Sequence, residues 1–267
     1  MTSMRIRSAC LAQLLLSARG LLVANRSSAL VETAWTLTAV GNATVSAAAA
    51  PTKQVVKIED VLSKHLSDKV MNGYGDFYEV LLSDKKNLPL QILEVGLGTK
   101  IKGAPASMDY MGKRPYKQDA SLYAWREYFP NAHIYGIDIQ KDTMLQNQQR
   151  IVTSLTDSTS PFQVARAMRK FGCKDHEACF DLIVDDGLHT EQGQLNTLAN
   201  TFPRLKTGGL YILEDIMWNY KMHFVEHPSI IREVVGERSA LFFIDNFRNS
   251  HTGQRLHTSA VMVIKKL

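Results

Sequence analysis

Two largely apolar runs of the chain end abruptly in acidic residues, and this pattern constrains the fold more than any other feature. The runs cover residues 180–184 and 209–213. An apolar strand that is buried on both faces has no reason to end in carboxylates unless its end opens onto a site. In an open parallel α/β sheet, ligands bind at the carboxyl ends of the strands. The pattern therefore predicts a metal or acid/base site at one sheet edge, made by Asp185, Asp186, His189, Glu214 and Asp215.

Alternating strand and helix patterns predict an α/β fold. Seven runs are typical of strands: 90–95, 133–138, 150–154, 180–185, 209–214, 240–244 and 259–264. The first five alternate with helical patterns, which is typical of a doubly wound parallel sheet. The last two follow one another and indicate a hairpin. We therefore expect a Rossmann-like, mostly parallel seven-stranded sheet with an antiparallel C-terminal β-hairpin strand.

Residues 1–54 differ in composition from the rest and are interpreted as a targeting leader or linker that is disordered. Residues 1–50 hold four Arg, no Lys and a single acid, and the 27 basic and 25 acidic residues of 51–267 nearly balance. Bulk charge therefore does not indicate a nucleic-acid partner. An Arg-bearing, acid-poor leader favours an organellar transit peptide, with the mitochondrion as the expected compartment. A secretory signal, a plastid address and an extension without any address are the alternatives.

Residues 55–267 are expected to form one folded domain. Its N-terminal part, 57–85, has a helical apolar period, which assigns Tyr74, Phe77 and Tyr78 to a core helix face in preference to an acceptor pocket. The segment 100–119 is rich in Gly, Pro and Lys and fits no regular element, so we expect an insert or lid over the strand ends. The apolar run at 9–18 is too short and interrupted for a membrane span.

Three cysteines are too few for a disulfide framework. Cys173 and Cys179 are separated by a spacing that fits no standard zinc pattern, and a fourth ligand is missing. We expect the two to be ordinary thiols beside a strand.

A glycine-rich turn follows the first strand. It contains Gly96 and Gly98, and Glu94 stands just before it. Such a turn lets a ligand approach the backbone closely. The third glycine of the dinucleotide fingerprint is absent, which disfavours a pyrophosphate on the following helix. Asp138 ends the second strand, where an acid can bind ribose hydroxyls; the alternative is a solvated strand-end acid.

Taken together, four motifs resemble those of class I S-adenosylmethionine-dependent methyltransferases, and in particular the metal-dependent sugar O-methyltransferases of macrolide biosynthesis, the mycinamicin and demethylmacrocin type. The motifs lie at 93–98, 128–138, 181–189 and 202–215, within a resemblance that covers about residues 70–220. It implies S-adenosylmethionine and Mg²⁺ as cofactors. The implied S-adenosylmethionine contacts are Glu94, Gly96 and Gly98 for the methionine part, Asp138 for the ribose and Asp157 for the adenine side.

The same resemblance implies that Mg²⁺ binds to Asp186, Glu214 and Asp215. Physical chemistry agrees, because neighbouring strand ends lie about 4.8 Å apart and can share one ion, and because oxygen ligands favour Mg²⁺ over zinc. His189 is placed to act as general base, with a helix cap as the alternative role. The alternative for Glu214 and Asp215 is that both are solvated acids in a loop. No role is assigned to Asp185.

The predicted function is therefore S-adenosylmethionine-dependent and Mg²⁺-dependent O-methyl transfer to a hydroxyl of a small acceptor, such as a sugar, polyol or natural product. The alternatives are a nicotinamide-dependent oxidoreductase and a non-catalytic S-adenosylmethionine-binding module. Expected partners are the small-molecule acceptor alone, with no nucleic acid and no integral membrane span. A homo-oligomer is compatible with the resemblance, because relatives build lids from neighbouring subunits.

Overall fold

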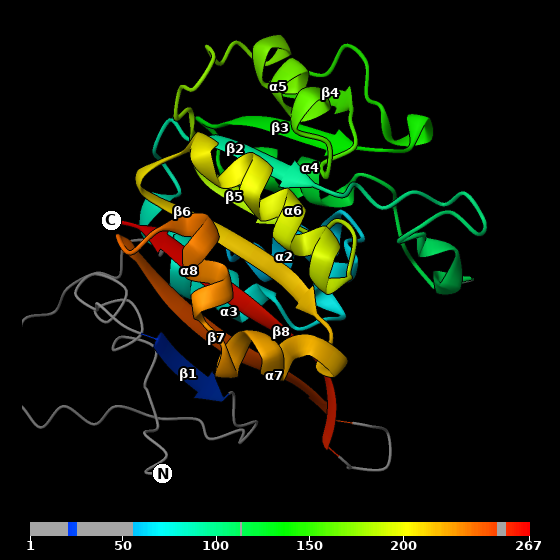
Figure 1. The fold of residues 1–267 in the computed structure, drawn as a ribbon. Helices are drawn as coiled ribbons and strands as arrows, with labels where there is room; N and C mark the ends of the chain where they lie inside the picture. The colour runs from blue at the N-terminus through cyan, green and yellow to red at the C-terminus, as the bar shows by residue number, and fades with distance from the viewer. Residues whose placement is uncertain (1–20, 26–55, 113, 250–254) are drawn as a thin grey trace, which may run out of the picture.

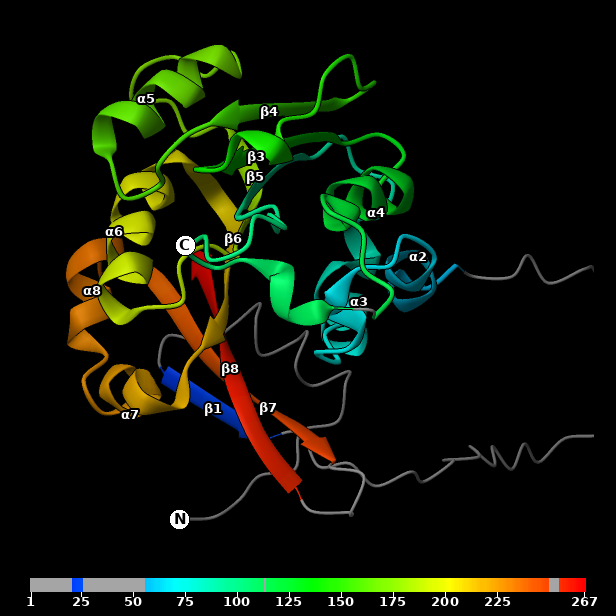
Figure 2. The same cartoon turned by 90° about the vertical axis from the view of Figure 1, so that its right-hand side faces the viewer.

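The architecture is a β-sheet covered by helices on both faces (Figures 1 and 2). The structure is a computed structural model that describes residues 21–25, 56–112, 114–249 and 255–267. The strands are β1 (Leu21–Asn25), β2 (Gln91–Val95), β3 (His133–Asp138), β4 (Ile151–Leu155), β5 (Phe180–Asp185), β6 (Leu205–Ile216), β7 (Ser239–Asn249) and β8 (Arg255–Lys266). The helices are α2 (Ile58–Lys64), α3 (Gly75–Leu82), α4 (Ala120–Tyr128), α5 (Pro161–Lys170), α6 (Glu191–Thr201), α7 (Trp218–Glu226) and α8 (Ser229–Val235), with short 3₁₀ turns that include η1 (Asp68–Val70) and η3 (Met108–Met111).

The sheet has the strand order β1-β7-β8-β6-β5-β2-β3-β4. Every neighbouring pair is parallel except the two that involve β8. The predicted α/β class, with seven mostly parallel strands and an antiparallel C-terminal strand, is confirmed. Within the predicted leader the structure describes only β1, which adds an eighth strand at the edge beside β7. That segment is thus paired, and the rest of 1–54 lies outside the described residues.

Two apolar layers bury the sheet. In Figure 2, α2, α3 and α4 cover one face and α5, α6, α7 and α8 cover the other. Successive side chains of a strand point to opposite faces, so Leu182 and Val184 of β5 pack in the first layer and Ile183 packs in the second. A strand covered on both faces must be apolar throughout, and the acids are therefore confined to the strand ends.

The N-terminal part of the domain does not form one helix, although its apolar period predicts one. It divides into α2, η1 and α3. Leu66 and Gly73 both adopt positive φ, at 61° and 69°, and these left-handed residues end one helical segment and precede the next. Between them, the Ser67 hydroxyl caps η1 by accepting a hydrogen bond from the backbone of Lys69. The break brings η1 to the strand ends.

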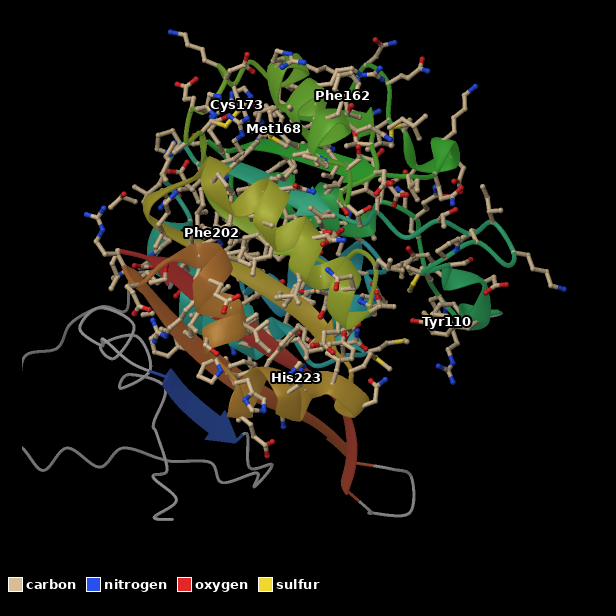
Figure 3. All side chains as sticks on the ribbon, viewed as in Figure 1. Tyr110, Phe162, Met168, Cys173, Phe202 and His223 are labelled. Carbon is tan, nitrogen blue, oxygen red and sulfur yellow. A yellow bond between two sulfur atoms is a disulfide. The ribbon has the colours of Figure 1, made fainter. Side chains whose placement is uncertain are left out.

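The insert at 100–119 lies next to the same strand ends. Backbone hydrogen bonds join Met108 to Thr99 and Asp119 to Leu97. Tyr110 stands on the outer part of the insert, 66% exposed (Figure 3). Whether the insert opens and closes as a lid stays a prediction.

The prediction of two ordinary thiols is wrong, because Cys173 and Cys179 form a disulfide (Figure 3). The segment between α5 and β5 folds back on itself and brings the two Cα atoms to 6.0 Å. This separation lies in the range that a disulfide requires, and it depends on a loop conformation that the cysteine spacing does not specify.

Candidate active site

A cavity of about 330 Å³ lies at the carboxyl ends of β2, β3, β5 and β6. Seven of the nine predicted site residues line it: Gly96, Gly98, Asp138, Asp157, Asp186, His189 and Asp215. The other two, Glu94 and Glu214, are fully buried and do not reach its surface. The topology explains this convergence, because β2, β3, β5 and β6 are parallel and end at one edge.

The glycine turn brings two strand ends together. Gly96 has a φ of 84°, and a Cβ placed on it would lie 2.0 Å from the carbonyl oxygen of Asp186. The adjoining backbone is joined by a hydrogen bond from the Asp186 amide to Val95, at 2.9 Å. Gly98, with a φ of 74°, similarly leaves room for Tyr116, whose hydroxyl donates to the Gly98 carbonyl at 2.8 Å. The two glycines therefore let the backbone of Asp186 approach the turn closely, and they also leave space for the cavity.

Asp138 and Asp157 are held rigidly at the cavity wall. The two oxygens of Asp138 accept hydrogen bonds from the backbone amides of Leu97 and Gln140, each at 2.7 Å, while burial raises its pKa. Asp157 accepts from the backbone amide and the hydroxyl of Thr159, at 2.9 and 2.7 Å. Both carboxylates are thus oriented before any ligand arrives.

The two adjacent acids at the end of β5, Asp185 and Asp186, have different surroundings. Asp185 is 1% exposed and accepts hydrogen bonds from the Tyr211 hydroxyl at 2.9 Å and from the Gly187 amide at 3.3 Å. Burial raises the pKa of Asp185 to about 7. Asp185, which the sequence left without a role, therefore holds the turn, and Asp186 points into the cavity.

A β-bulge separates the orientations of Glu214 and Asp215. Leu213 pairs with Met262 and Ile216 pairs with Ala260, so three steps on β6 match two on β8. Asp215 takes a φ of 47° within this bulge. A bulge re-aims side chains next to a site, and here it leaves Glu214 inside the protein while Asp215 lines the cavity.

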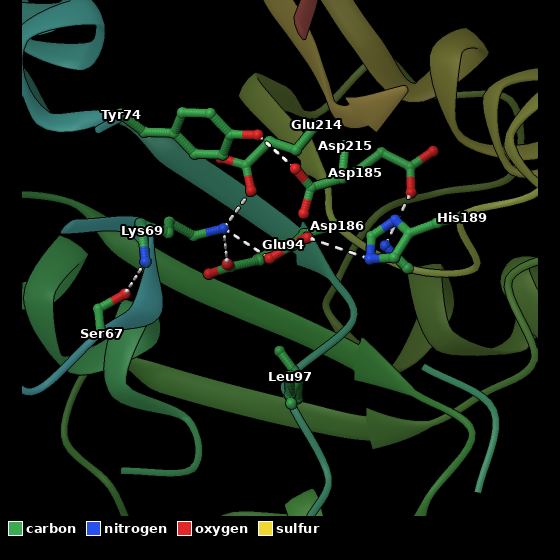
Figure 4. Close-up of polar contacts among 12 residues, drawn as sticks. Ser67, Lys69, Tyr74, Glu94, Leu97, Asp185, Asp186, His189, Glu214 and Asp215 are labelled. Atoms are coloured by element: carbon green, nitrogen blue, oxygen red, sulfur yellow. Dashed lines mark hydrogen bonds and ion pairs between the residues drawn. The ribbon is translucent and has the colours of Figure 1, made fainter. Parts of the chain in front are cut away.

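The ammonium of Lys69 lies among the strand-end carboxylates (Figure 4). Its Nζ is 2.7 Å from Oδ2 of Asp186 and 3.3 Å from Oε1 of Glu94, and it also pairs with Glu214. The residue is 1% exposed. Burial alone would lower the pKa of Lys69, but the carboxylates of Asp186, Glu214 and Glu94 raise it well above its ordinary value. Lys69 is therefore a buried cation at the centre of the site.

Glu94 and Glu214 are internal partners of this cation. Glu94 also accepts from the Trp125 indole at 2.8 Å, and Glu214 accepts from the Tyr78 hydroxyl. Burial raises the pKa of both carboxyls. The expected contact between Glu94 and the methionine part is not supported by this position, because the side chain is sealed from the cavity.

Among the residues that the structure describes, three potential ligands lie close enough together to hold a metal ion: Asp186, His189 and Asp215. One ligand atom from each lies within 4.8 Å of the others. Nε2 of His189 is 3.8 Å from Oδ1 of Asp186, and the Tyr74 hydroxyl donates to Asp215. Two cavity-facing carboxylates fit a hard divalent cation. Glu214, expected as a third ligand, is not in this group, and its oxygens bond to Lys69 and Tyr78.

His189 does not cap the following helix. Thr190 is the N-cap of α6, because its hydroxyl accepts a hydrogen bond from the backbone amide of Gly193 at 3.2 Å. The His189 side chain is left at the cavity, where it is 29% exposed. This geometry removes the capping role that competed with general-base catalysis.

Sequence reasoning missed Asp68 and Lys69. It placed Tyr74 and Tyr78 correctly in the core but did not foresee that their hydroxyls bond to Asp215 and Glu214. Asp68 lines the cavity, and burial together with Asp186 raises its pKa to about 6. The signal available was a lysine and two tyrosines inside an apolar helical period. That pattern predicts a packed helix face, and only the break at η1 turns these polar atoms toward the strand ends.

Curated proteins similar to this chain are O-methyltransferases. The chain is 28% identical to mycinamicin VI 2''-O-methyltransferase of Micromonospora griseorubida over 60% of its length and 36% of the relative's. It is 26% identical to demethylmacrocin O-methyltransferase of Streptomyces fradiae over 68% of its length and 42% of the relative's. The chain thus spans about two fifths of these relatives. No family model matches it. The resemblance predicted from the motifs is confirmed.

Solved structures show the same fold. The MycE methyltransferase of the mycinamycin pathway, in complex with Mg and SAH, superposes with a TM-score of 0.53 at 21% identity, over 79% of this chain and 55% of that one. A complex that also holds mycinamycin VI gives a TM-score of 0.51. The chain therefore has the Rossmann-like fold of S-adenosylmethionine-dependent methyltransferases.

The prediction of organelle targeting is wrong. The relatives are enzymes of Streptomyces and Micromonospora, bacteria that contain neither mitochondria nor plastids. An Arg-bearing, acid-poor composition is a weak signal, and it misled here. As for the membrane, none of the described helices combines the length and apolar character needed to cross one.

Replacing Gly96 tests the close approach of the two strand ends. Gly96→Ala and Gly103→Ala share a left-handed backbone, so each should lose about 1–2 kcal/mol of unfolding free energy from strain. Gly103 has open space around it. Gly96→Ala must in addition displace the Asp186 backbone, so it should lose clearly more unfolding free energy than Gly103→Ala. Urea unfolding of both variants measures the difference, and equal losses would contradict the packing described.

Asp119 predicts a pH dependence of stability. It is 6% exposed, and its Oδ1 has no hydrogen-bond partner among the described residues. Burial, Asp138 and Asp142 raise its pKa from 3.8 to about 8. Between these values the folded state binds more protons than the unfolded state, so this group makes stability fall as pH rises from about 4 to about 8. Asp119→Asn should remove this contribution and be more stable than the wild type above pH 8. Thermal unfolding across this range tests it, and an unchanged pH profile would refute it.

Proposed function

We propose that this chain is an S-adenosylmethionine-dependent O-methyltransferase that requires Mg²⁺ and acts on a hydroxyl of a small acceptor, such as a sugar, polyol or natural product. One observation carries the proposal: a single cavity is lined by the glycine turn, by Asp138 and by the group Asp186, His189 and Asp215. A methyl donor and an activated hydroxyl must meet in one space. This cavity has residues suited to the donor along one side and residues suited to a metal-bound hydroxyl along the other.

The cofactor side of the cavity is proposed as the wall made by Gly96, Gly98, Asp138 and Asp157. Asp138 ends β3, where a carboxylate suits ribose hydroxyls, and Asp157 follows β4 on the adenine side. The glycines let the methionine part approach the backbone. Glu94 contributes from behind this wall, as a partner of Trp125 and Lys69.

The acceptor side is proposed to contain the metal ligands Asp186 and Asp215 and the base His189. A bound Mg²⁺ would supply Lewis-acid stabilisation of the acceptor oxygen. His189 would take the hydroxyl proton on its imidazole, whose Nε2 is near Asp186. Tyr74 and Lys69 hold the two carboxylates in place. Because the sulfonium methyl group is already reactive, the remaining task is alignment of acceptor and donor.

The substrate class is supported by the relatives, whose names describe O-methylation of mycinamicin VI, demethylmacrocin and a rhamnosyl tetracenomycin. The chain covers only part of those proteins, and the acceptor of this chain is accordingly proposed at the level of a hydroxylated small molecule. The polar atoms at the cavity favour this reading over the oxidoreductase alternative, which has no use for the cluster of carboxylates. A homo-oligomer stays a prediction.

Calorimetry separates the candidate functions. S-adenosylmethionine should bind, NAD should not, and an acceptor screen with a labelled methyl donor should show transfer that EDTA abolishes and Mg²⁺ restores. A chain that binds NAD and not S-adenosylmethionine would exclude the proposal. Binding without transfer to any hydroxylated acceptor would favour the binding module.

Two variants test the acceptor-side roles. His189→Gln should lower kcat by about 10²–10⁴-fold, the usual contribution of a general base, with S-adenosylmethionine affinity unchanged. His133→Gln is the matched control, because His133 is an exposed histidine at the opposite end of β3. Asp186→Asn should abolish transfer and also keep cofactor affinity. Wild-type turnover in either site variant would refute its assigned role.

A further inference from the structure

The backbone carbonyl of Glu214 is held by a glutamine that has no part in the predicted site. Gln194, in α6, donates a hydrogen bond from its side-chain amide to this carbonyl at 2.9 Å, and its side-chain oxygen accepts one from the Tyr220 hydroxyl of α7, also at 2.9 Å. Resting on the proposed function, we infer that Gln194 is a positioning residue: it fixes the bulge of β6 relative to His189 and thereby directs the carboxylates of this strand end toward the cation.

The bulge takes Glu214 out of the regular ladder of β6. Leu213 and Ile216 are each paired with a residue of β8, whereas Glu214 between them has no paired residue in the described part of β8. A bulge disrupts the ladder locally, and a buried carbonyl at such a step needs a donor from elsewhere. Glu214 is fully buried. The Gln194 amide supplies a donor at this step.

The two hydrogen bonds of Gln194 have a fixed direction. A backbone carbonyl can only accept, so the amide nitrogen of Gln194 must face Glu214. The amide oxygen then faces Tyr220, whose hydroxyl donates to it. The two side chains are buried, with exposed fractions of 2% for Gln194 and 7% for Tyr220. This chain of hydrogen bonds therefore specifies one orientation of the amide, which an apolar side chain cannot reproduce.

Gln194 belongs to the first turn of the helix that follows His189. Its backbone amide donates to the carbonyl of Thr190 at 2.9 Å, and Thr190 is the N-cap of α6 directly after His189. At the other end of the contact, Asp215 comes one residue after the held carbonyl. One side chain thus joins the turn of the proposed base to the bulge of the proposed metal ligands. His189, Asp215 and Asp186 lie within 4.8 Å of one another, a spacing that depends on both elements.

Tyr220 extends the same support to α7. This helix starts two residues after the end of β6, and it lies with α6 on the same face of the sheet (Figure 2). The Tyr220 ring packs edge-on against Phe224, with the ring centroids 5.6 Å apart. Because its hydroxyl is directed at Gln194, the segments before and after the bulge are held from the same side.

Cation affinity separates positioning from a purely stabilising role. Gln194→Met keeps the side-chain length and removes both hydrogen bonds, so Mn²⁺ should bind about 10- to 100-fold more weakly, the usual loss when a supporting partner of a metal ligand is removed. The affinity for S-adenosylmethionine should be unchanged, because the proposed cofactor wall follows β2, β3 and β4. Calorimetry of the full chain with MnCl₂ and with S-adenosylmethionine measures both affinities.

Gln192→Met is the matched control. Gln192 lies on the same helix, is exposed, and donates to the Asn196 side chain at 2.9 Å. The same substitution there should leave Mn²⁺ affinity at the wild-type value. A folded Gln194→Met protein that also binds Mn²⁺ like the wild type would overturn the inference, even if its thermal stability were lower.

Two milder variants test the inference if Gln194→Met does not fold. Gln194→Asn keeps an amide but is one methylene too short for the contact with Glu214, so Mn²⁺ should bind about tenfold more weakly or worse. Tyr220→Phe removes one hydroxyl and leaves the bond from Gln194 to the carbonyl, so its loss of affinity should be smaller. Equal losses, or a larger loss in Tyr220→Phe, would contradict a role that acts through the carbonyl of Glu214.

These measurements do not depend on methyl transfer. A chain that binds Mn²⁺ but no S-adenosylmethionine would exclude the proposed function, while the order of Mn²⁺ affinities still decides the role of Gln194. If transfer is observed and Gln194→Met binds Mn²⁺ like the wild type, the inference fails and the proposed function stands. If the wild type binds no Mn²⁺, the inference fails together with the proposed metal site.

Discussion

The buried ion cluster around Lys69 is the interaction on which the rest of the site depends. Removing one partner of a buried ion pair typically costs about 3–5 kcal/mol, because the other charge is left uncompensated. Here one ammonium is shared by Glu94, Asp186 and Glu214, from three strand ends. The N-terminal segment and the sheet edge are therefore mutually required, and the helical part before β2 is as much a component of the site as the acid-ended strands.

Two backbone devices then decide what faces the cavity. The glycine turn allows the loop after β2 to touch the backbone of Asp186, with no space for a side chain at Gly96. The bulge in β6 turns Asp215 outward while Glu214 stays inside. Ligand-facing and buried acids are thus separated by backbone geometry, since all of them are chemically equivalent carboxylates. The metal set that the resemblance implied, Asp186, Glu214 and Asp215, stays a prediction.

Much of the architecture was predictable, since β2, β5 and most of β6 are buried apolar runs whose length distinguishes them from helices. The convergence of Asp138, Asp157, Asp186 and Asp215 followed from the rule that parallel strands share an edge. The roles of Glu94 and Glu214 were not predictable, because burial depends on what packs behind a strand end. The strand β1 and the disulfide also depend on contacts between segments whose local sequences carry no distinct signal.

The sequence by itself determined the order of strands and helices and the placement of carboxylates at strand ends, because periodicity and polarity are local properties. Its motifs also determined the resemblance to methyltransferases. Only the tertiary structure decided that Lys69 enters the cluster, that Tyr74 and Tyr78 bond to acids of β6, and which acids stay outside the cavity. These outcomes arise from a helix break and a bulge, whose effect is to join residues more than a hundred positions apart.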